Sequence, residues 1–330
     1  MIKKIIFISI LPIIVLISFE IFLRYSPYMY GTSPVIYDKD IGMWHKSNYS
    51  GYTVQDCYKN RYIFNKLGLP KNIYKYDTNK KDVILLGDSF VEALMIKNRN
   101  IIHNSLAKEF NHKYNFLNYG LFGTTTIQHA MILKDKVNLN RVKYILHFVN
   151  IEDDLFEIKT QNSTTLSRPK INIKFKTLNN YTIIYPREKR FYDTVSDILG
   201  NYQLYTFSKK SIRYLLDFIK NSNKNIDVNS SESIEDFTKE WLSLKGGIYL
   251  INKYAKSHKI KYRVIVSSTN RKNKNIIKDF LNREKIKYIF LDEAAKKMNI
   301  KITLYNCDNH WDDKAHQQIA KIVKKFKLIE

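Results

Sequence analysis

The sequence contains little cysteine and no spacing that is typical of a metal site. Cys57 and Cys307 are the only two cysteines among 330 residues, and neither Cys-x-x-Cys nor His-x-x-x-His occurs. We therefore expect no structural zinc site, and nothing indicates another metal or a cofactor. On the oxidising side of a membrane the pair could form one disulfide, whereas two buried free thiols are the alternative. The sequence leaves this choice open because it does not give the Cα separation.

Acidic residues are scarce relative to basic ones. Lysine and arginine number 55 against 31 aspartates and glutamates, which gives a net charge of +24. Such a surface favours anionic partners. However, the basic residues are scattered, and the chain has no recognition helix, zinc finger or RNA-binding signature. Nucleic acid is therefore not an expected partner. With 44% apolar residues the chain can form a core, so it is not a disordered protein.

Long apolar runs are absent except at the N-terminus. Residues 5–23 are apolar apart from Ser9, Ser18 and Glu20, and two lysines precede them. A signal peptide would have a shorter apolar core and a small-x-small cleavage site, and no convincing site precedes Arg24. We therefore predict a retained transmembrane anchor over residues 1–24. The paired lysines place its N-terminus in the cytoplasm and the rest of the chain on the periplasmic side.

Beyond the anchor, the pattern predicts two regions. Residues 25–80 look irregular, with three prolines, and indicate a stalk that becomes an N-terminal flank. Residues 81–330 alternate between short apolar runs and helical patterns, which predicts an α/β domain with a mostly parallel sheet and helices on both faces. The expected strands are 82–86, 114–118, 143–149, 261–267, 287–291 and 301–304. The expected helices are 98–110, 125–137, 246–257, 272–283 and 312–327.

An insertion interrupts this alternation between about residues 157 and 244. Its alternating segments on either side of Asn179-Asn180 predict a β-hairpin. A helical pattern over 203–220 and a polar loop follow. The insertion follows the strand at 143–149 and therefore begins near the carboxyl edge of the sheet. There it either shapes a substrate groove or has no part in substrate binding.

The stretch KDVILLGDSFVEAL contains the first candidate site residue. The apolar run from Val83 to Leu86 stops at Gly87-Asp88-Ser89, which indicates a buried strand that runs into a tight turn. In open α/β sheets, ligands bind at the carboxyl ends of the strands, so a serine directly after this strand is a candidate site residue. A plain Gly-Asp-Ser turn is the alternative, and Asp88 is expected to tie that turn with its side chain.

Polar residues that follow the other strands supply the remaining groups that acyl transfer requires. Ser89 needs a base, for which His310 is the candidate, and Asp308 is the acid that would orient the imidazole. The donors expected to stabilise an oxyanion are the backbone N–H groups of Ser89 and Gly120 and the side-chain amide of Asn150. Gly120 has no Cβ, so its backbone can approach a substrate closely.

This order of motifs resembles the SGNH or GDSL-type hydrolases. Their blocks are Gly-Asp-Ser, then a Gly, then an Asn, and Asp-x-x-His near the end, and VILLGDSF and NYGLFG are the more specific matches. The resemblance covers residues 82–155 and 261–326. It implies a flavodoxin-like three-layer α/β/α fold, a Ser-His-Asp triad and acyl-ester chemistry without a metal. The Asp-x-His-Trp form, followed by His316, resembles a membrane-anchored branch that adds or removes O-acyl groups on envelope polysaccharides.

The chain departs from that family at two places. The third block reads Asn150-Ile-Glu-Asp-Asp, and an ungapped match would put Asp153 where the asparagine belongs. A carboxylate there would repel an oxyanion, so we favour Asn150. The spacing from Asp308 to His310 is also one residue shorter than the commonest pattern.

The sequence thus predicts a serine-dependent acyl-ester enzyme, either an esterase or an O-acyltransferase. Its expected substrate is an acylated or anionic glycan outside the cytoplasm, and a transferase would imply a membrane acyl-donor protein as partner. The alternative is a non-catalytic envelope assembly protein that binds polysaccharide, with Trp44, Trp311 and tyrosines stacking on sugars.

Overall fold

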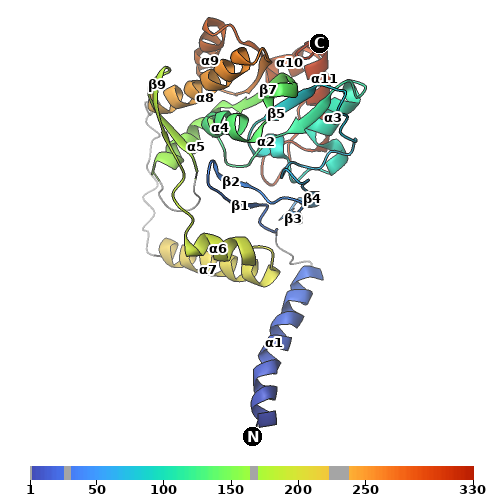
Figure 1. The fold of residues 1–330 in the computed structure, drawn as a ribbon, viewed down its shortest axis with the longest axis vertical. Helices are drawn as coiled ribbons and strands as arrows, with labels where there is room; N and C mark the ends of the chain where they lie inside the picture. Colours follow the sequence, from blue (N-terminus) through green and yellow to red (C-terminus); the bar gives the residue numbers. More distant parts are fainter. Residues whose placement is uncertain (1, 26–30, 164–169, 223–237) are drawn as a thin grey trace.

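A five-stranded parallel sheet forms the centre of the main domain (Figure 1). The computed structural model describes residues 2–25, 31–163, 170–222 and 238–330. The strand order is β11-β10-β7-β5-β6, which is the flavodoxin-like order 2-1-3-4-5 reversed. The bounds are β5 Asp82–Leu86, β6 Asn115–Asn118, β7 Val142–Asn150, β10 Lys261–Ser267 and β11 Lys287–Phe290. The predicted α/β class with a parallel sheet is confirmed.

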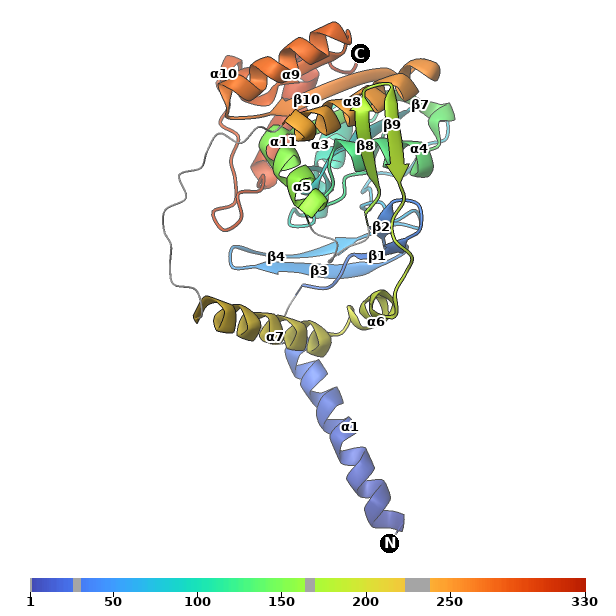
Figure 2. The ribbon, with the colours of Figure 1, turned by 90° about the vertical axis from the view of Figure 1, so that its left-hand side faces the viewer.

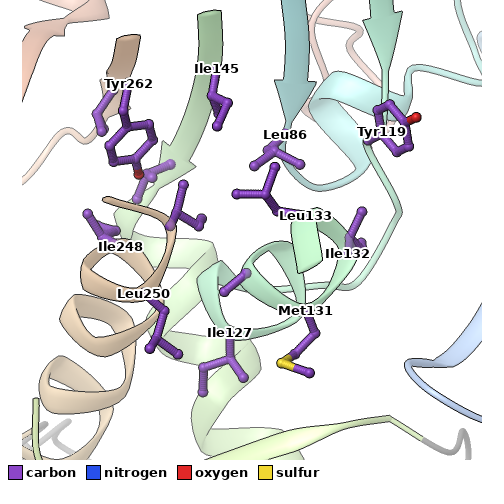
Figure 3. Packing of buried hydrophobic residues seen from close by; sticks show 14 of the residues in the cluster. Leu86, Tyr119, Ile127, Met131, Ile132, Leu133, Ile145, Ile248, Leu250 and Tyr262 are labelled. Atoms are coloured by element: carbon purple, nitrogen blue, oxygen red, sulfur yellow. The ribbon is translucent and has the colours of Figure 1, made fainter. Parts of the chain in front are cut away.

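Helices cover both faces of this sheet, which explains why the central residues of its strands are mainly apolar. Side chains of β5 alternate between two cores: Ile84 and Leu86 belong to one, and Val83 and Leu85 to the other. The first core, seen in Figure 3, contains residues of α4 (Thr126–Lys136), α5 (Ile151–Ser163), α8 (Thr238–Ser257) and α9 (Arg271–Arg283). The second contains residues of α2 (Ser89–Glu92), α3 (Ile102–Glu109), α10 (Leu291–Lys297) and α11 (Asp313–Lys325). Short 3₁₀ helices span Asn98–Asn100 and Leu139–Arg141.

The N-terminal flank is more regular than predicted. After α1 (Ile2–Tyr25) it forms two antiparallel hairpins, β1 (Val35–Asp38) with β2 (Gly42–His45) and β3 (Ser50–Gln55) with β4 (Tyr58–Ile63). At the first turn the Asp38 carboxylate accepts hydrogen bonds from the N–H groups of Asp40 and Ile41. Such side-chain turns let a polar sequence form a hairpin without the Asn-Gly signal that would have predicted one.

The predicted membrane span stays a prediction. Side chains of α1 are described from Ile10 onwards, and among the described residues no helix is both long and apolar enough to cross a bilayer.

The insertion contains the predicted hairpin and helix. Strands β8 (Asn172–Thr177) and β9 (Asn180–Ile184) pair antiparallel, and α6 (Phe191–Leu199) and α7 (Gln203–Ser222) follow. The hairpin packs on α8: a Cβ at Gly246 would lie 2.3 Å from the ring of Phe175. The hairpin therefore lies against a helix on one face of the sheet. Most of the predicted polar loop lies outside the described residues.

The strand predicted at 301–304 was wrong. Only an isolated antiparallel bridge joins Leu304 to Trp311. The chain turns back on itself here, since the N–H of Tyr305 donates to the carbonyl of His310 at 2.8 Å. The segment is thus a loop at the carboxyl edge of the sheet, and this loop carries Asp308 and His310.

Candidate active site

The sharp turn after β5 places Ser89 at the first position of α2. Asp88 caps this helix, because its side chain accepts a hydrogen bond from the N–H of Phe90 at 2.9 Å. Gly87 is required by the close approach of the helix, since a Cβ there would lie 2.3 Å from Val91 Cγ2. Asp88 is therefore structural, as the sequence predicted.

The structure brings Ser89, His310 and Asp308 together from opposite ends of the domain. Ser89 Oγ lies 2.8 Å from His310 Nε2. His310 Nδ1 lies 3.2 Å from Asp308 Oδ2, which is an ion-pair distance without hydrogen-bond geometry. The other oxygen of Asp308 accepts from the N–H of His310 at 3.1 Å. The arrangement is that of a nucleophile, a base and an orienting acid, and such contacts often tighten when substrate binds.

Asp308 is held by the N-terminal flank. Tyr58 donates a hydrogen bond to Asp308 Oδ2 at 2.6 Å. The preceding residues are also joined, because Cys57 and Cys307 form a disulfide with a Cα separation of 5.9 Å. Burial, together with the hydrogen bond and charge of Asp308, raises the pKa of Tyr58, so the phenol keeps its proton. The sequence analysis missed Tyr58, although its position beside one of the two cysteines was a signal.

Replacing Tyr58 with phenylalanine is expected to lower kcat about tenfold and leave KM nearly unchanged. Without the phenol, Asp308 Oδ2 loses a donor that fixes its orientation, whereas Tyr58 does not line either of the two cavities beside Trp311. Steady-state kinetics on an activated acetate ester measure both constants. Tyr305→Phe is the matched control, because the ring of Tyr305 lies 5.1 Å from that of Tyr58 and its hydroxyl donates to Asp313 rather than to Asp308. Equal losses in the two variants would show that the hydrogen bond to Asp308 has no special role.

The two predicted backbone donors differ in availability. Within the described residues, the N–H of Ser89 makes no hydrogen bond, so it is free to bind an oxyanion. The N–H of Gly120 instead donates to Asn118 Oδ1 at 2.9 Å. A Cβ at Gly120 would lie 2.4 Å from the backbone N of Glu92. Gly120 is thus required for close packing against α2, and the expectation that its N–H is a free donor is corrected.

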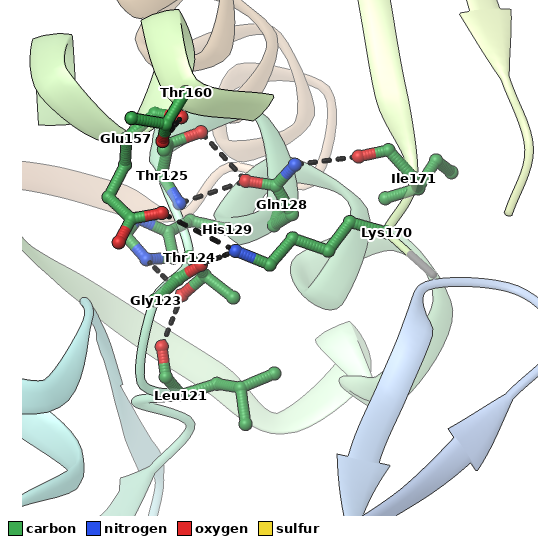
Figure 4. Close-up of polar contacts among 10 residues, drawn as sticks. All are labelled: Leu121, Gly123, Thr124, Thr125, Gln128, His129, Glu157, Thr160, Lys170 and Ile171. Carbon is green, nitrogen blue, oxygen red and sulfur yellow. Dashed lines mark hydrogen bonds and ion pairs between the residues drawn. The ribbon is translucent and has the colours of Figure 1, made fainter. Parts of the chain in front are cut away.

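Gly123 lies in the same loop and has a free N–H among the described residues. Its φ of +60° is in the left-handed region that favours glycine. Figure 4 shows how this loop is held: Lys170 donates to the carbonyl of Gly123, and Gln128 bonds to both Thr125 and Ile171. The loop is therefore rigidly supported from α4 and from the start of β8.

A buried hydrogen-bonded chain lies behind this loop. Thr124 Oγ1 contacts His129 Nε2 at 3.0 Å, His129 Nδ1 contacts His147 Nε2 at 3.0 Å, and His147 Nδ1 contacts the hydroxyl of Tyr262 at 2.6 Å. Burial lowers the pKa of His129 to about 3 and that of His147 well below its usual value. Both imidazoles are thus neutral, and they connect the loop to β7 and β10.

Asn150 ends β7 and lines a small cavity together with Asp88, Phe90 and Trp311. Its amide donates to Asp153 Oδ2 at 2.5 Å. Asp153 does not line that cavity, so Asn150 is better placed than Asp153 to donate a hydrogen bond to an oxyanion.

Three carboxyl groups lie near the serine turn, and their exposure differs: Asp154 is buried, Asp88 is half-buried and Asp153 reaches the surface. Burial raises the pKa of Asp88 to about 7, and the negative charges of Asp153 and Glu92 add to this effect. The pKa of Asp153 is also raised by burial, while the nearby His310 opposes the rise. Burial raises the pKa of Asp154 well above its usual value, with Asp88 and Asp153 contributing. These carboxyl groups are thus not all ionised at neutral pH, which limits negative charge near the serine.

Aromatic rings and a groove border the catalytic residues. The ring of Phe90 lies 4.8 Å from that of His310 and 5.0 Å from that of Trp311. A groove of about 560 Å³ continues from Trp311 along Leu291, Ile302 and Leu304. Two lysines, Lys296 and Lys301, also line it. Among the described residues, no cluster of three or more His, Cys, Asp or Glu side chains could hold a metal ion.

The fold and these contacts define an α/β protein with a Ser-His-Asp arrangement at the carboxyl edge of a parallel sheet. No family model and no curated protein matches the chain. Among solved structures, an acetyl xylan esterase, AlAXEase, is 11% identical with a TM-score of 0.42, covering 74% of this chain and 98% of its own. A putative lipolytic protein of the G-D-S-L family from Desulfitobacterium hafniense is 13% identical with a TM-score of 0.37, covering 76% and 100%. Axe2, an acetylxylan esterase from Geobacillus stearothermophilus, is 11% identical with a TM-score of 0.40, covering 76% and 95%.

Two of these solved structures are acetyl xylan esterases, and the third is a putative lipolytic protein of the G-D-S-L family, the family that the sequence motifs resemble. Because the identities and TM-scores are low, the fold assignment rests on the strand order. The function proposed below rests on the contacts of Ser89, His310 and Asp308.

Proposed function

We propose that this protein is a serine-dependent acyl-ester enzyme with Ser89 as nucleophile. The observation that carries the proposal is the 2.8 Å contact between Ser89 Oγ and His310 Nε2, with Asp308 on the other side of the imidazole. A protein that only binds polysaccharide would not require a base in contact with a half-buried serine at a strand-to-helix turn. The enzyme is therefore favoured over the binding protein.

The reaction has two acyl-transfer steps. His310 Nε2 accepts the proton of Ser89 as Oγ attacks the ester carbonyl, and Asp308 stabilises the imidazolium that forms. The negative oxygen of the tetrahedral intermediate is stabilised by the N–H of Ser89, with the Asn150 amide and the free N–H of Gly123 as further candidates. The intermediate collapses, and the alcohol leaves with the proton from His310. Water or a sugar hydroxyl then attacks the acyl-serine by the same route.

The proposed substrate is an acylated glycan outside the cytoplasm. The disulfide between Cys57 and Cys307 supports an oxidising compartment. The apolar run of residues 5–23 after two lysines supports anchoring in the cytoplasmic membrane, with the domain on its outer side. The groove beside Trp311 offers apolar surface, and its charged lining residues are Lys296, Lys301 and Asp292, a positive balance that suits an anionic or acylated sugar chain.

An active-site probe tests the reaction class. The purified full chain in detergent should react with a fluorophosphonate, and mass spectrometry should locate the label on Ser89. His310→Ala should lose the label while the disulfide remains intact. Folded protein that neither takes up the probe nor releases acetate from an activated ester would overturn the proposal.

Mass spectrometry of the cell's surface glycan, with and without the protein, distinguishes an esterase from a transferase. An esterase removes an acyl mass from the glycan, whereas a transferase adds one and would need an acyl-donor partner.

A further inference from the structure

Two helices of the insertion expose apolar side chains that nothing covers in the described part of the structure. In α6 and α7 the exposed fractions reach 85% for Phe191, 60% for Ile198, 59% for Ile212 and 57% for Leu215. Leu199 and Leu216 are exposed beside them. Contiguous apolar surface of this kind is typical of a contact with another protein or with a membrane.

The exposed side chains form one stripe on each helix. In α6 they occur at i, i+7 and i+8, and in α7 at i, i+3 and i+4, which is the spacing of a single helix face. The other face of α6 is polar and paired within the fold. Asp193 binds Arg187 at 2.6 and 2.9 Å, and Lys189 contacts Asp197 at 2.8 Å. The apolar stripes are thus not needed to attach these helices to the domain.

Helices α6 and α7 lie at the end of the molecule from which α1 projects (Figures 1 and 2). The carboxylate of Glu20 in α1 accepts hydrogen bonds from the N–H groups of Gln203 and Leu204 at 3.0 and 2.7 Å. The rings of Phe19 and Phe207 meet edge to face at 5.9 Å. Residues of α1 from Ile10 to Phe22 are also largely exposed and apolar. Helix α1 therefore packs against the first turns of α7, so its exposed apolar residues and α7 lie at the same end of the molecule.

Lysines accompany the stripe on α7. Lys209 and Lys210 are exposed, and the ammonium group of Lys209 lies 5.7 and 5.9 Å from the ring centres of Tyr192 and Tyr205. Lysines and tyrosines beside an apolar stripe are the composition of helices that lie in a membrane interface, where the ammonium groups meet anionic headgroups.

We propose that the α6–α7 surface, made of Phe191, Ile198, Leu199, Ile212, Leu215 and Leu216, lies in the interface of an anionic phospholipid bilayer. The two helices would rest parallel to the membrane plane, with their apolar side chains about 5–10 Å below the headgroups. Together with α1 they give the domain two separate membrane contacts. The catalytic edge of the sheet is then held in one orientation relative to the lipid surface instead of swinging on a single helix.

Tryptophan quenching in vesicles tests this contact. The full chain is reconstituted into vesicles of phosphatidylcholine and phosphatidylglycerol whose acyl chains carry bromine near the headgroup. Leu215→Trp should be quenched at least about twofold more strongly than Ile73→Trp, after subtraction of the signal of the unsubstituted chain. Ile73 is the matched control: it is exposed to a similar degree but bonded to Asn104 of α3, away from α7 (Figure 1). Vesicles without phosphatidylglycerol should give weaker quenching of Leu215→Trp.

Other results would overturn the proposal. Equal quenching of the two variants in sedimented vesicles would show that α7 does not touch the lipid. If light scattering in detergent shows a dimer that Leu215→Asp converts to a monomer, the stripes are instead covered by a second copy. A chain that does not sediment with vesicles at all overturns both this contact and the proposed anchor. Ester hydrolysis measured on the same samples is a separate readout, so a failure of the enzyme proposal remains distinguishable.

Discussion

Ser89→Ala is expected to reduce ester turnover by about 10⁴- to 10⁶-fold, because the acyl-enzyme route is lost with Oγ. The residual activity would come from the remaining oxyanion donors, which still stabilise attack by water. The variant should fold normally, since the Ser89 side chain is only partly buried and the turn is held by Asp88 and Gly87. Activity against an activated acetate ester, together with a thermal unfolding curve, measures both expectations.

Ser257→Ala is the control for this variant. Ser257 ends α8, far from the catalytic edge in sequence and fold, and its hydroxyl contacts only nearby residues, the carbonyl of Tyr254 at 2.9 Å and His258 Nδ1 at 3.1 Å. This change should leave activity within about twofold of the original chain. If Ser89→Ala kept more than a tenth of the activity, Ser89 would not be the nucleophile, and the contact with His310 would be structural.

The central sheet could be predicted because its strands are short, continuous apolar runs. Val83 to Leu86 is buried on both faces, so no alternation is needed to recognise it, and polar turn residues mark its end. His310 was instead located by its place just before the predicted last helix and by the family resemblance, because the strand predicted at 301–304 is a loop in the structure. Patterns of this kind depend only on residues that are close in the sequence, so one sequence is enough to recognise them.

Contacts between distant segments could not be predicted in the same way. The β1–β2 hairpin depends on a turn formed by the Asp38 side chain, and the pairing of Tyr58 with Asp308 depends on how the flank folds over the domain. The role assigned to Gly120 failed for a related reason. A glycine signals close approach of the backbone, but the sequence does not say whether a substrate or another helix approaches, and here it is α2.

The second large effect is expected for Asp308→Asn, which should lower kcat by about 10⁴-fold, the loss seen for this change in the Ser-His-Asp template. Asp308 accepts hydrogen bonds on both oxygens, from the N–H of His310 on Oδ1 and from Tyr58 on Oδ2. An amide group can accept on only one of these atoms. If its NH₂ takes the place of Oδ2, it donates to Nδ1 and the proton of the imidazole moves to Nε2. His310 then cannot accept the proton of Ser89.

Asp313→Asn provides the matched control for that variant because it lies in the same region with the same kind of partner. Its carboxylate accepts from Tyr305 at 3.1 Å and from Asn100 at 2.7 Å, yet it does not touch His310. Asp313→Asn should therefore lower the free energy of unfolding but reduce kcat by less than about tenfold. The double variant Tyr58→Phe with Asp308→Asn should be no slower than Asp308→Asn alone, since Tyr58 acts only through the carboxylate. Additive losses would instead mean that Tyr58 contacts the substrate or the imidazole by another route.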